Sequence, residues 1–264
     1  MPAFYTHYAI AREALKHLAP PTITLIKPHL PFYFFGAQGA DFCFFYRTLS
    51  SKKPNLGSYL HRQGGYDALC SLNAFSRYDN AIAAYALGYV THYAADCLFH
   101  PYVYARAQKS YLTHSLLENE FDKYFLRQDR ALIDEYLSFY RAKPSASQKE
   151  YLFLIYNTIL KKSEFAPLQK TAFQRALTLF FGYKPLSDKT IRLRPSPRTD
   201  PLNLRRLAWR YPADQTLIRT LSIPELYQEA ISLSLSLQTL FLQALQNKNG
   251  LSTSLFGKNY LTGI

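Results

Sequence analysis

The sequence has few of the features that mark disulfide-stabilised, secreted or membrane-spanning proteins. Its three cysteines, Cys43, Cys70 and Cys97, are odd in number and show no C-x-x-C spacing. This argues against a disulfide framework and favours free thiols in a reducing compartment. The N-terminal sequence has no charged lead followed by an apolar run and a small-residue cleavage site, so no signal peptide is visible. We therefore expect a cytoplasmic protein.

The sequence also lacks strand patterns, because no stretch alternates strictly at period two for long enough to predict a sheet. Helical periodicity and long apolar runs recur instead. We expect an all-α fold, formed by a single helical domain. The expected helices are Tyr5–Leu18, Tyr66–Phe75, Asp79–Tyr104, Ser110–Phe125, Asp129–Arg141, Gln148–Lys162, Pro167–Phe181 and Pro224–Gln246.

Three stretches outside these helices are expected to be irregular. Pro28 and Pro31 interrupt Leu25–Phe35, so an irregular backbone is expected there. Glycines and a proline predict a loop over Ser50–Gly65, and Asn247–Ile264 is expected to be a tail. We divide the chain into a helical core, 1–182, and a second part, 183–264. The second part should pack on the same domain as a basic, proline-rich loop, a C-terminal helix and the tail.

Acidic residues are scarce, since 31 Lys and Arg oppose 18 Asp and Glu, for a formal net charge of +13. The excess is densest in the proline-rich stretch Tyr183–Ala213, and the run from Lys184 to Arg210 is a candidate membrane-surface contact. A basic balance favours anionic partners, such as phosphate esters, lipid headgroups or nucleic acid, without choosing among them. Excess basic residues can also serve solubility alone.

The most informative stretch is Asp79–Tyr104, which is almost wholly apolar from Ala81 to Phe99. Such a run is typical of a helix in the middle of a domain. His92, Asp96 and His100 interrupt it at intervals of four, which places them on one face of the helix. A buried carboxylate needs a partner, and a metal ion supplies the charge it lacks. Pro101 predicts that His100 lies at the fraying end of the helix or just beyond it.

A second pair with the same spacing, His114 and Glu118, follows fourteen residues after His100. Imidazole and carboxylate at i and i+4 converge on one point, which is a common way to bind zinc. No thiolate is in register, which argues against a structural zinc finger. Three further residues, His7, Asp41 and His61, lie in apolar or glycine-rich surroundings, and Asp41 alone is either a helix N-cap or a ligand. Eight candidate ligands exceed what one tetrahedral ion can use, so we expect a multinuclear metal site between buried helices, which makes residues 1–182 a helical metal-binding core.

In their order along the chain these residues resemble the ligand set of the zinc-dependent phospholipase C family. The resemblance covers roughly residues 1–130 and implies a helical fold with two to three zinc ions. It implies that Asp41, His61, His92 and Asp96 hold one zinc, that His100, His114 and Glu118 hold a second, and that Asp96 bridges to a third shared with His7. Here the step from Asp96 to His100 is shorter than in the secreted enzymes of the family. In those enzymes the mature N-terminus also binds the third zinc.

The resemblance implies a zinc-dependent phosphodiester hydrolase, phospholipase C-like, in which a metal-bound hydroxide attacks phosphorus in line. Asp41 is then the candidate general base. Two other functions stay open. Single-strand nucleases and nucleotide phosphodiesterases share the implied fold and metals, and the net charge suits nucleic acid. The other is a non-catalytic protein, in which the metals only stabilise the helices and the basic loop binds a membrane or partner.

Overall fold

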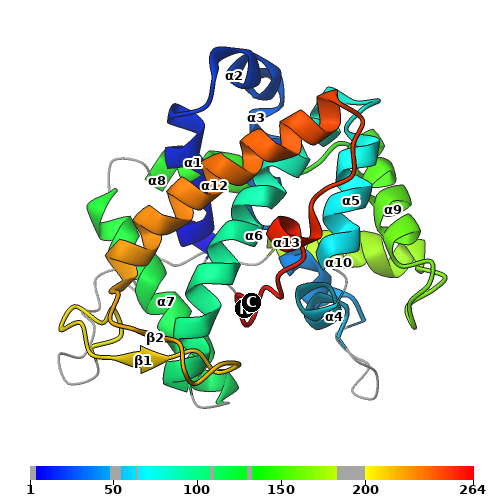
Figure 1. The fold of residues 1–264 in the computed structure, drawn as a ribbon. Coiled ribbons are helices and arrows are strands. Elements are labelled where there is room, and N and C mark those ends of the chain that lie inside the picture. Colours follow the sequence, from blue (N-terminus) through cyan, green and yellow to red (C-terminus); the bar gives the residue numbers. More distant parts are fainter. Residues whose placement is uncertain (1–3, 48–54, 64, 108–109, 130–132, 183–199) are drawn as a thin grey trace.

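A long buried helix, α6 (Asn80–Ala107), forms the centre of the computed structural model, and the other helices pack around it (Figure 1). The structure describes residues 4–47, 55–63, 65–107, 110–129, 133–182 and 200–264. Almost every side chain of α6 from Ile82 to Val103 is buried. This follows from its sequence, because a helix that is apolar on all sides must be covered on all sides.

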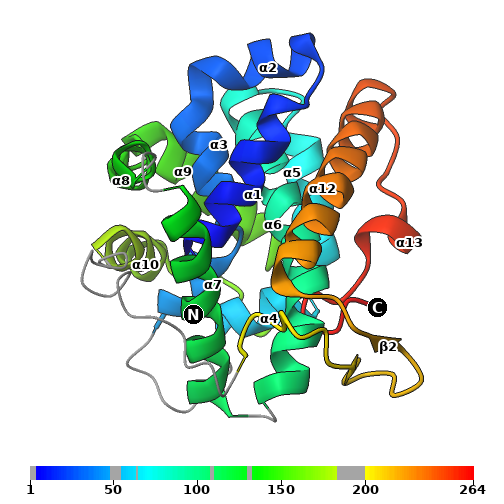
Figure 2. The ribbon, with the colours of Figure 1, turned by 90° about the vertical axis from the view of Figure 1, so that its left-hand side faces the viewer.

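Two helices provide the largest contacts with α6, and they come from opposite ends of the chain. They are α3 (Leu30–Gly36) and α12 (Ile223–Gln246). Figure 2 shows α12 along one side of α6, with α1 (Phe4–Lys16) beside it. The N-terminal and C-terminal parts of the chain thus share one core around α6.

The remaining elements complete the shell around α6. They are α2 (Pro20–Ile26), η1 (Lys27–His29), η2 (Asp41–Phe45), α4 (Leu56–Arg62), α5 (Gly65–Phe75), α7 (Tyr111–Gln128), α8 (Ile133–Arg141), α9 (Ala146–Ile159), α10 (Lys170–Gly182), β1 (Trp209–Arg210), β2 (Ile218–Arg219) and α13 (Thr253–Phe256). Within the described residues the only sheet is the antiparallel pair of β1 and β2.

The all-α prediction is confirmed, and each of the eight expected helices has a counterpart with shifted ends. Within the described part of the chain, no helix is long and apolar enough to cross a membrane. Most of the basic stretch, 183–199, lies outside the described residues. The rest of it is more regular than expected, because β1 lies within Tyr183–Ala213. The division of the chain at residue 182 stays a prediction.

The irregular backbone expected for Leu25–Phe35 is wrong. This region consists of the end of α2, then η1 and α3. Its prolines stand in the first turns of these helices, where the missing N–H would have no helical acceptor anyway. The prolines therefore begin helices here and do not interrupt them.

Two predictions about histidines are also wrong. His61 lies in a helix, α4, which the Asn55 side chain caps by accepting from the Ser58 N–H. His100 is not at a helix end, because α6 continues through Pro101 to Ala107. The residues beyond Pro101 are held by tertiary contacts, including a bond of 2.9 Å from the Tyr102 hydroxyl to the Pro201 carbonyl.

The segment 247–264, expected to be a tail, is packed against the core. It forms α13 and then returns to α4 and α6, where Tyr260 is buried. The Tyr260 N–H donates to the His61 carbonyl at 3.2 Å. The end of this segment therefore lies beside two of the candidate ligands.

The close approach of α3 and α6 makes a testable prediction at Gly88. A Cβ atom there would lie 2.0 Å from the Tyr33 carbonyl oxygen, which is backbone and cannot rotate away. Gly88→Ala would gain about 1 kcal/mol in helix propensity, but overpacking costs about 1–3 kcal/mol. We expect the overpacking cost to exceed the gain and the free energy of unfolding to fall, measured by chemical denaturation at equal zinc content.

The matched control is Gly182→Ala at the end of α10, where an added Cβ would meet nothing within 4 Å. It should change stability by no more than about 0.5 kcal/mol. A Gly88→Ala protein more stable than wild type would mean that the two helices are not in such close contact.

Candidate metal centre

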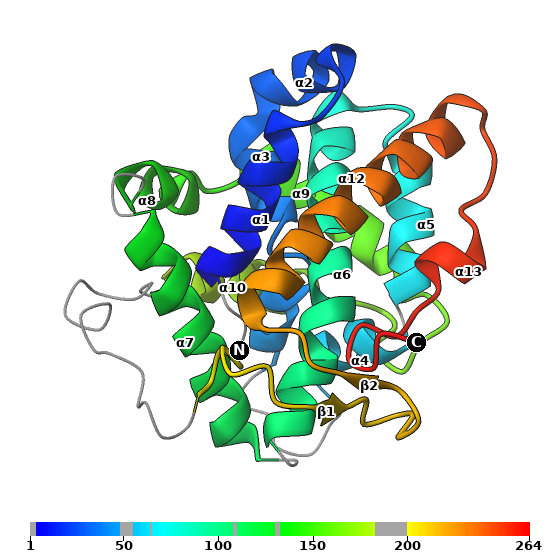
Figure 3. The same ribbon diagram turned by 60° about the vertical axis from the view of Figure 1, so that its left-hand side comes forward.

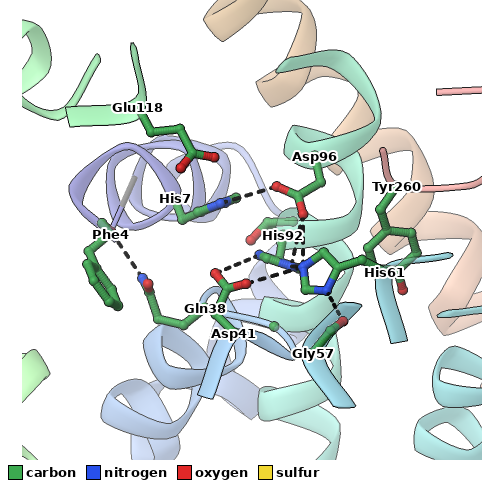
Figure 4. Close-up of polar contacts among 12 residues, drawn as sticks. Phe4, His7, Gln38, Asp41, Gly57, His61, His92, Asp96, Glu118 and Tyr260 are labelled. Atoms are coloured by element: carbon green, nitrogen blue, oxygen red, sulfur yellow. Dashed lines mark hydrogen bonds and ion pairs between the residues drawn. The ribbon is translucent and has the colours of Figure 1, made fainter. Parts of the chain in front are cut away.

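All eight candidate ligands lie together beside α6, although they come from five elements. Figure 4 labels six of them, all but His100 and His114. Seven of the eight are buried, and the eighth, His114, is partly exposed. The contributing elements are α1 with His7, η2 with Asp41, α4 with His61, α6 with His92, Asp96 and His100, and α7 with His114 and Glu118.

Asp96 is the central carboxylate of the cluster, and its two oxygens face different histidines. Oδ1 lies 3.3 Å from Nε2 of His7. Oδ2 lies 3.3 Å from Nε2 of His61 and 3.3 Å from Nε2 of His92. The His61 and His92 Nε2 atoms are themselves 3.3 Å apart, so these two nitrogens and Asp96 Oδ2 form an equilateral triangle.

That triangle has the dimensions of a zinc site. Donor atoms at 2.0–2.1 Å from a tetrahedral zinc are roughly 3.3–3.4 Å from one another. Asp41 Oδ1 lies 3.2 Å from His61 Nε2, on the same side of that imidazole as the triangle. Two nitrogens at 3.3 Å with an intervening carboxylate are better explained by a shared cation than by a hydrogen bond between imidazoles.

The second group lies nearer the surface, between α6 and α7. Glu118 Oε1 is 3.0 Å from His114 Nε2 and 3.5 Å from His100 Nε2. His100 Nδ1 is 3.6 Å from Asp96 Oδ2, which connects this group to the central carboxylate. A third combination, of His7, Asp41 and His92, also has ligand atoms close enough for an ion. The side chains thus form overlapping groups and not one closed site.

Charges within the cluster shift the pKa values strongly. Burial by itself lowers the pKa of His61, but the carboxylates of Asp41 and Asp96 outweigh burial and raise it to about 10. Burial dominates at His92 and lowers its pKa to about 4. Burial would raise the pKa of Asp96, but the His100 and His92 imidazoles hold it well below its usual range. Without a metal, protons are therefore the cations that balance these carboxylates.

Several polar atoms of the cluster have no hydrogen-bond partner within the described structure. They include Nδ1 of His92, Oδ2 of Asp41 and Oδ2 of Asp96, each buried. Leaving buried polar atoms unpaired is costly, since it forfeits hydration without a replacement. A zinc ion would remove this cost, because the cluster offers the donor types that zinc prefers in the spacing that it requires. The residues present therefore fit zinc.

Residues that the sequence did not single out hold the histidines in place. His61 Nδ1 lies 2.7 Å from the Gly57 carbonyl, and His100 Nδ1 lies 3.1 Å from the Tyr260 carbonyl. A carbonyl can only accept, so each Nδ1 carries its proton there and Nε2 faces the cluster. The Gly57 carbonyl lies one helical turn before His61, so this contact could be inferred from the sequence once the helix was known. The Tyr260 contact spans 160 residues and left no local signal.

Two further positions shape the centre. Gly39 adopts a positive φ of 53°, and a Cβ there would lie 2.0 Å from Cδ2 of His92. Asp122 of α7 accepts from the N–H groups of Tyr5 and Thr6 at 3.1 and 2.8 Å, and so caps the start of α1 just before His7. Both features set the path of the backbone that presents candidate ligands.

Comparison with known proteins gives one match. The family model described as zinc dependent phospholipase C matches residues 6–166, which is more than half of the 264 residues. No curated protein and no solved structure matches the chain. The matched range includes all eight candidate ligands and ends before β1, β2 and α12.

The charge state of the cluster predicts proton release when zinc binds. At pH 7 His61, with a pKa of about 10, is protonated, and zinc binds only the neutral imidazole. Zinc uptake by the metal-free protein should therefore release at least one proton. The apparent affinity should fall by about tenfold for each proton released per unit decrease in pH.

Isothermal titration calorimetry at pH 7 in buffers of different ionisation enthalpy counts these protons. A binding enthalpy that is the same in every buffer would mean that His61 is neutral or is not a ligand.

Proposed function

The chain belongs to the zinc-dependent phospholipase C family, and we propose that it hydrolyses phosphodiester bonds with two to three zinc ions held by the eight-residue cluster. The family supports a phospholipase C-like hydrolase and a phospholipid substrate. The finer proposal, a specific ligand set with named roles, depends on the geometry. The single observation that carries it is the 3.3 Å triangle of His61, His92 and Asp96.

The residues would divide among the ions according to which donor atoms converge. His61, His92 and Asp96, with Asp41, would hold one ion, and His100, His114 and Glu118 a second. Asp96 is placed to bridge, because its two oxygens face different imidazoles. His7 would join Asp96 at a third ion. When bound, zinc supplies Lewis acidity, which acidifies water and polarises phosphoryl oxygens.

Asp41 is the proposed general base. Its Oδ1 atom is engaged with His61, whereas Oδ2 lies 4.0 Å from His92 Nδ1 and has no hydrogen-bond partner in the described structure. Oδ2 can therefore accept a proton from a water molecule as its oxygen attacks phosphorus. The new P–O bond forms as the bond to the leaving oxygen breaks, and that oxygen takes up a proton from solvent water and leaves as an alcohol. A phospholipid would give a phosphomonoester and diacylglycerol.

The position of His114 suggests where substrate enters. Its side chain is 14% exposed, against 9% for His100 and 6% for Glu118, so this group is the least covered part of the cluster. His7, His61 and His92 lie deeper. A phosphodiester would therefore approach from the α6–α7 side, and its bulky substituents would remain outside.

Two other functions remain as outcomes of the test below. The net charge of +13 suits a single-strand nuclease or nucleotide phosphodiesterase, which would act through the same residues. In a non-catalytic protein the metals would serve stability alone. No specific contact among the described residues favours either of these functions over lipid hydrolysis.

The activity test compares three substrates on zinc-loaded protein: a phospholipid, single-stranded DNA and a chromogenic phosphodiester. We expect phospholipid to be cleaved best, with release of a phosphomonoester. Asp41→Asn keeps the shape of the side chain but removes its basicity, so kcat should fall by about 10²–10⁴-fold. Zinc content measured on the same sample separates loss of the base from loss of a metal.

The matched control is Asp67→Asn, an exposed carboxylate of α5 outside the cluster, which should keep full activity. Preferred cleavage of DNA would support the nuclease. No cleavage of any of the three substrates by protein with a full zinc content would refute hydrolysis and leave the structural role.

A further inference from the structure

The segment 200–219, which contains β1 and β2 and is here termed the hairpin segment, carries a concentration of exposed apolar side chains. Leu204, Leu207, Leu217 and Ile218 are 58, 50, 41 and 50% exposed. They are four of the twelve large apolar side chains that are exposed in the described part of the chain. Single exposed leucines are ordinary, but four within fifteen residues mark a surface that meets something apolar.

Hydrogen bonds fix the backbone that presents these side chains. The buried Asn203 donates from Nδ2 to the carbonyls of Leu207 and Leu221, both at 3.0 Å, and its Oδ1 accepts from the Leu207 N–H at 3.1 Å. Trp209 is buried and donates from Nε1 to the Leu221 carbonyl at 3.2 Å. The apolar side chains are thus held outward by a fixed loop and are not simply left over from an incomplete core.

Arginines accompany the apolar side chains. The hairpin segment holds four of them, Arg205, Arg206, Arg210 and Arg219, against two acids, Asp200 and Asp214. Arg206 and Arg219 form ion pairs with Glu225 and Glu229 of α12. Arg210 pairs with Ile218 across the two strands. Because Trp209 points inward and strand residues alternate, Arg210 and Ile218 face away from the protein together. A guanidinium beside an apolar side chain suits the boundary between lipid headgroups and acyl chains.

The hairpin segment packs against the C-terminal end of α6, the helix that carries His100. The Tyr102 hydroxyl of α6 donates to the Pro201 carbonyl, and the Tyr102 and Trp209 rings meet with centroids 5.5 Å apart. Tyr102 follows His100 by two residues. Figures 1 and 3 both show the hairpin beside the end of α6 where the helix finishes, next to α7. A flat surface against the hairpin would therefore lie near the C-terminal end of α6, the helix that carries His100.

We propose that the hairpin segment docks the protein onto an anionic lipid membrane. The leucines and Ile218 would enter the interface, and Arg210 beside Ile218 would contact headgroup phosphates. The proposal rests on the proposed function, because a phospholipid substrate lies in a bilayer and the centre must be brought to it. It locates membrane contact on the described segment 200–219.

The test uses sedimentation with vesicles of phosphatidylcholine alone or in equal mixture with phosphatidylglycerol. Asp41→Asn is the background, so that lipid is not consumed. We expect binding to the anionic vesicles that weakens with salt. Leu207→Ser with Ile218→Ser should weaken it by roughly tenfold, and Arg210→Gln by about fivefold. Hydrolysis of dihexanoyl phosphatidylcholine below its micelle concentration should be unchanged when these substitutions are made with Asp41 intact.

Matched controls are Leu154→Ser with Leu179→Ser, exposed leucines of α9 and α10, and Arg175→Gln, an exposed arginine of α10. They should bind vesicles as the background does. Equal weakening by the controls, or no effect of the hairpin substitutions, would overturn the proposal. A dimer in sedimentation velocity that Leu207→Ser with Ile218→Ser dissociates would also overturn it, since the surface would then bind a second copy.

The two proposals fail separately. Cleavage of the soluble lipid by a protein that never binds vesicles would refute docking and leave the hydrolase intact. Binding through the hairpin without cleavage of any phosphodiester would refute the hydrolase and leave docking intact.

Discussion

The constraint on which the rest of the structure depends is the burial of the Asp96 carboxylate in the middle of an apolar helix. Asp96 is 3% exposed, and four imidazoles lie within 3.6 Å of its oxygens. An ionised carboxylate in such surroundings needs compensating positive charge. Three elements bring His7, His61, His92 and His100 to it, so compensation of one charge fixes how α1, α4 and α6 meet.

The same constraint explains why distant parts of the chain converge on α6. The imidazoles must be held in the tautomer that presents Nε2, and backbone carbonyls of Gly57 and Tyr260 do this for His61 and His100. Asp122 fixes the start of α1 before His7. Loosening any of these supports would change a ligand without touching it, which is the usual behaviour of groups behind a metal site. The centre therefore extends to the last residues described.

Helical periodicity accounts for what could be predicted from the sequence. His92, Asp96 and His100 share a face because an α-helix repeats every 3.6 residues, and His114 and Glu118 do so for the same reason. The pairing of Tyr260 with His100 was invisible, since it joins positions 160 residues apart and uses a backbone carbonyl. The prolines misled because Pro28 and Pro31 begin helices here, and Pro101 is tolerated where tertiary contacts hold the helix beyond it. Contacts of high sequence separation decided the Tyr260 and Pro101 cases, whereas Pro28 and Pro31 follow the local preference of proline for the first turn of a helix.

The measurement that tests the central claim most directly is the zinc content per chain of protein purified without chelator. It should be made by elemental analysis on wild type, Asp96→Asn and the exposed control Asp67→Asn. A metal centre organised by Asp96 predicts two to three zinc ions in wild type and in the control, and fewer in Asp96→Asn. One zinc or none in wild type, or an undiminished content in Asp96→Asn, would mean that this buried cluster of histidines and acids is not organised around metal ions.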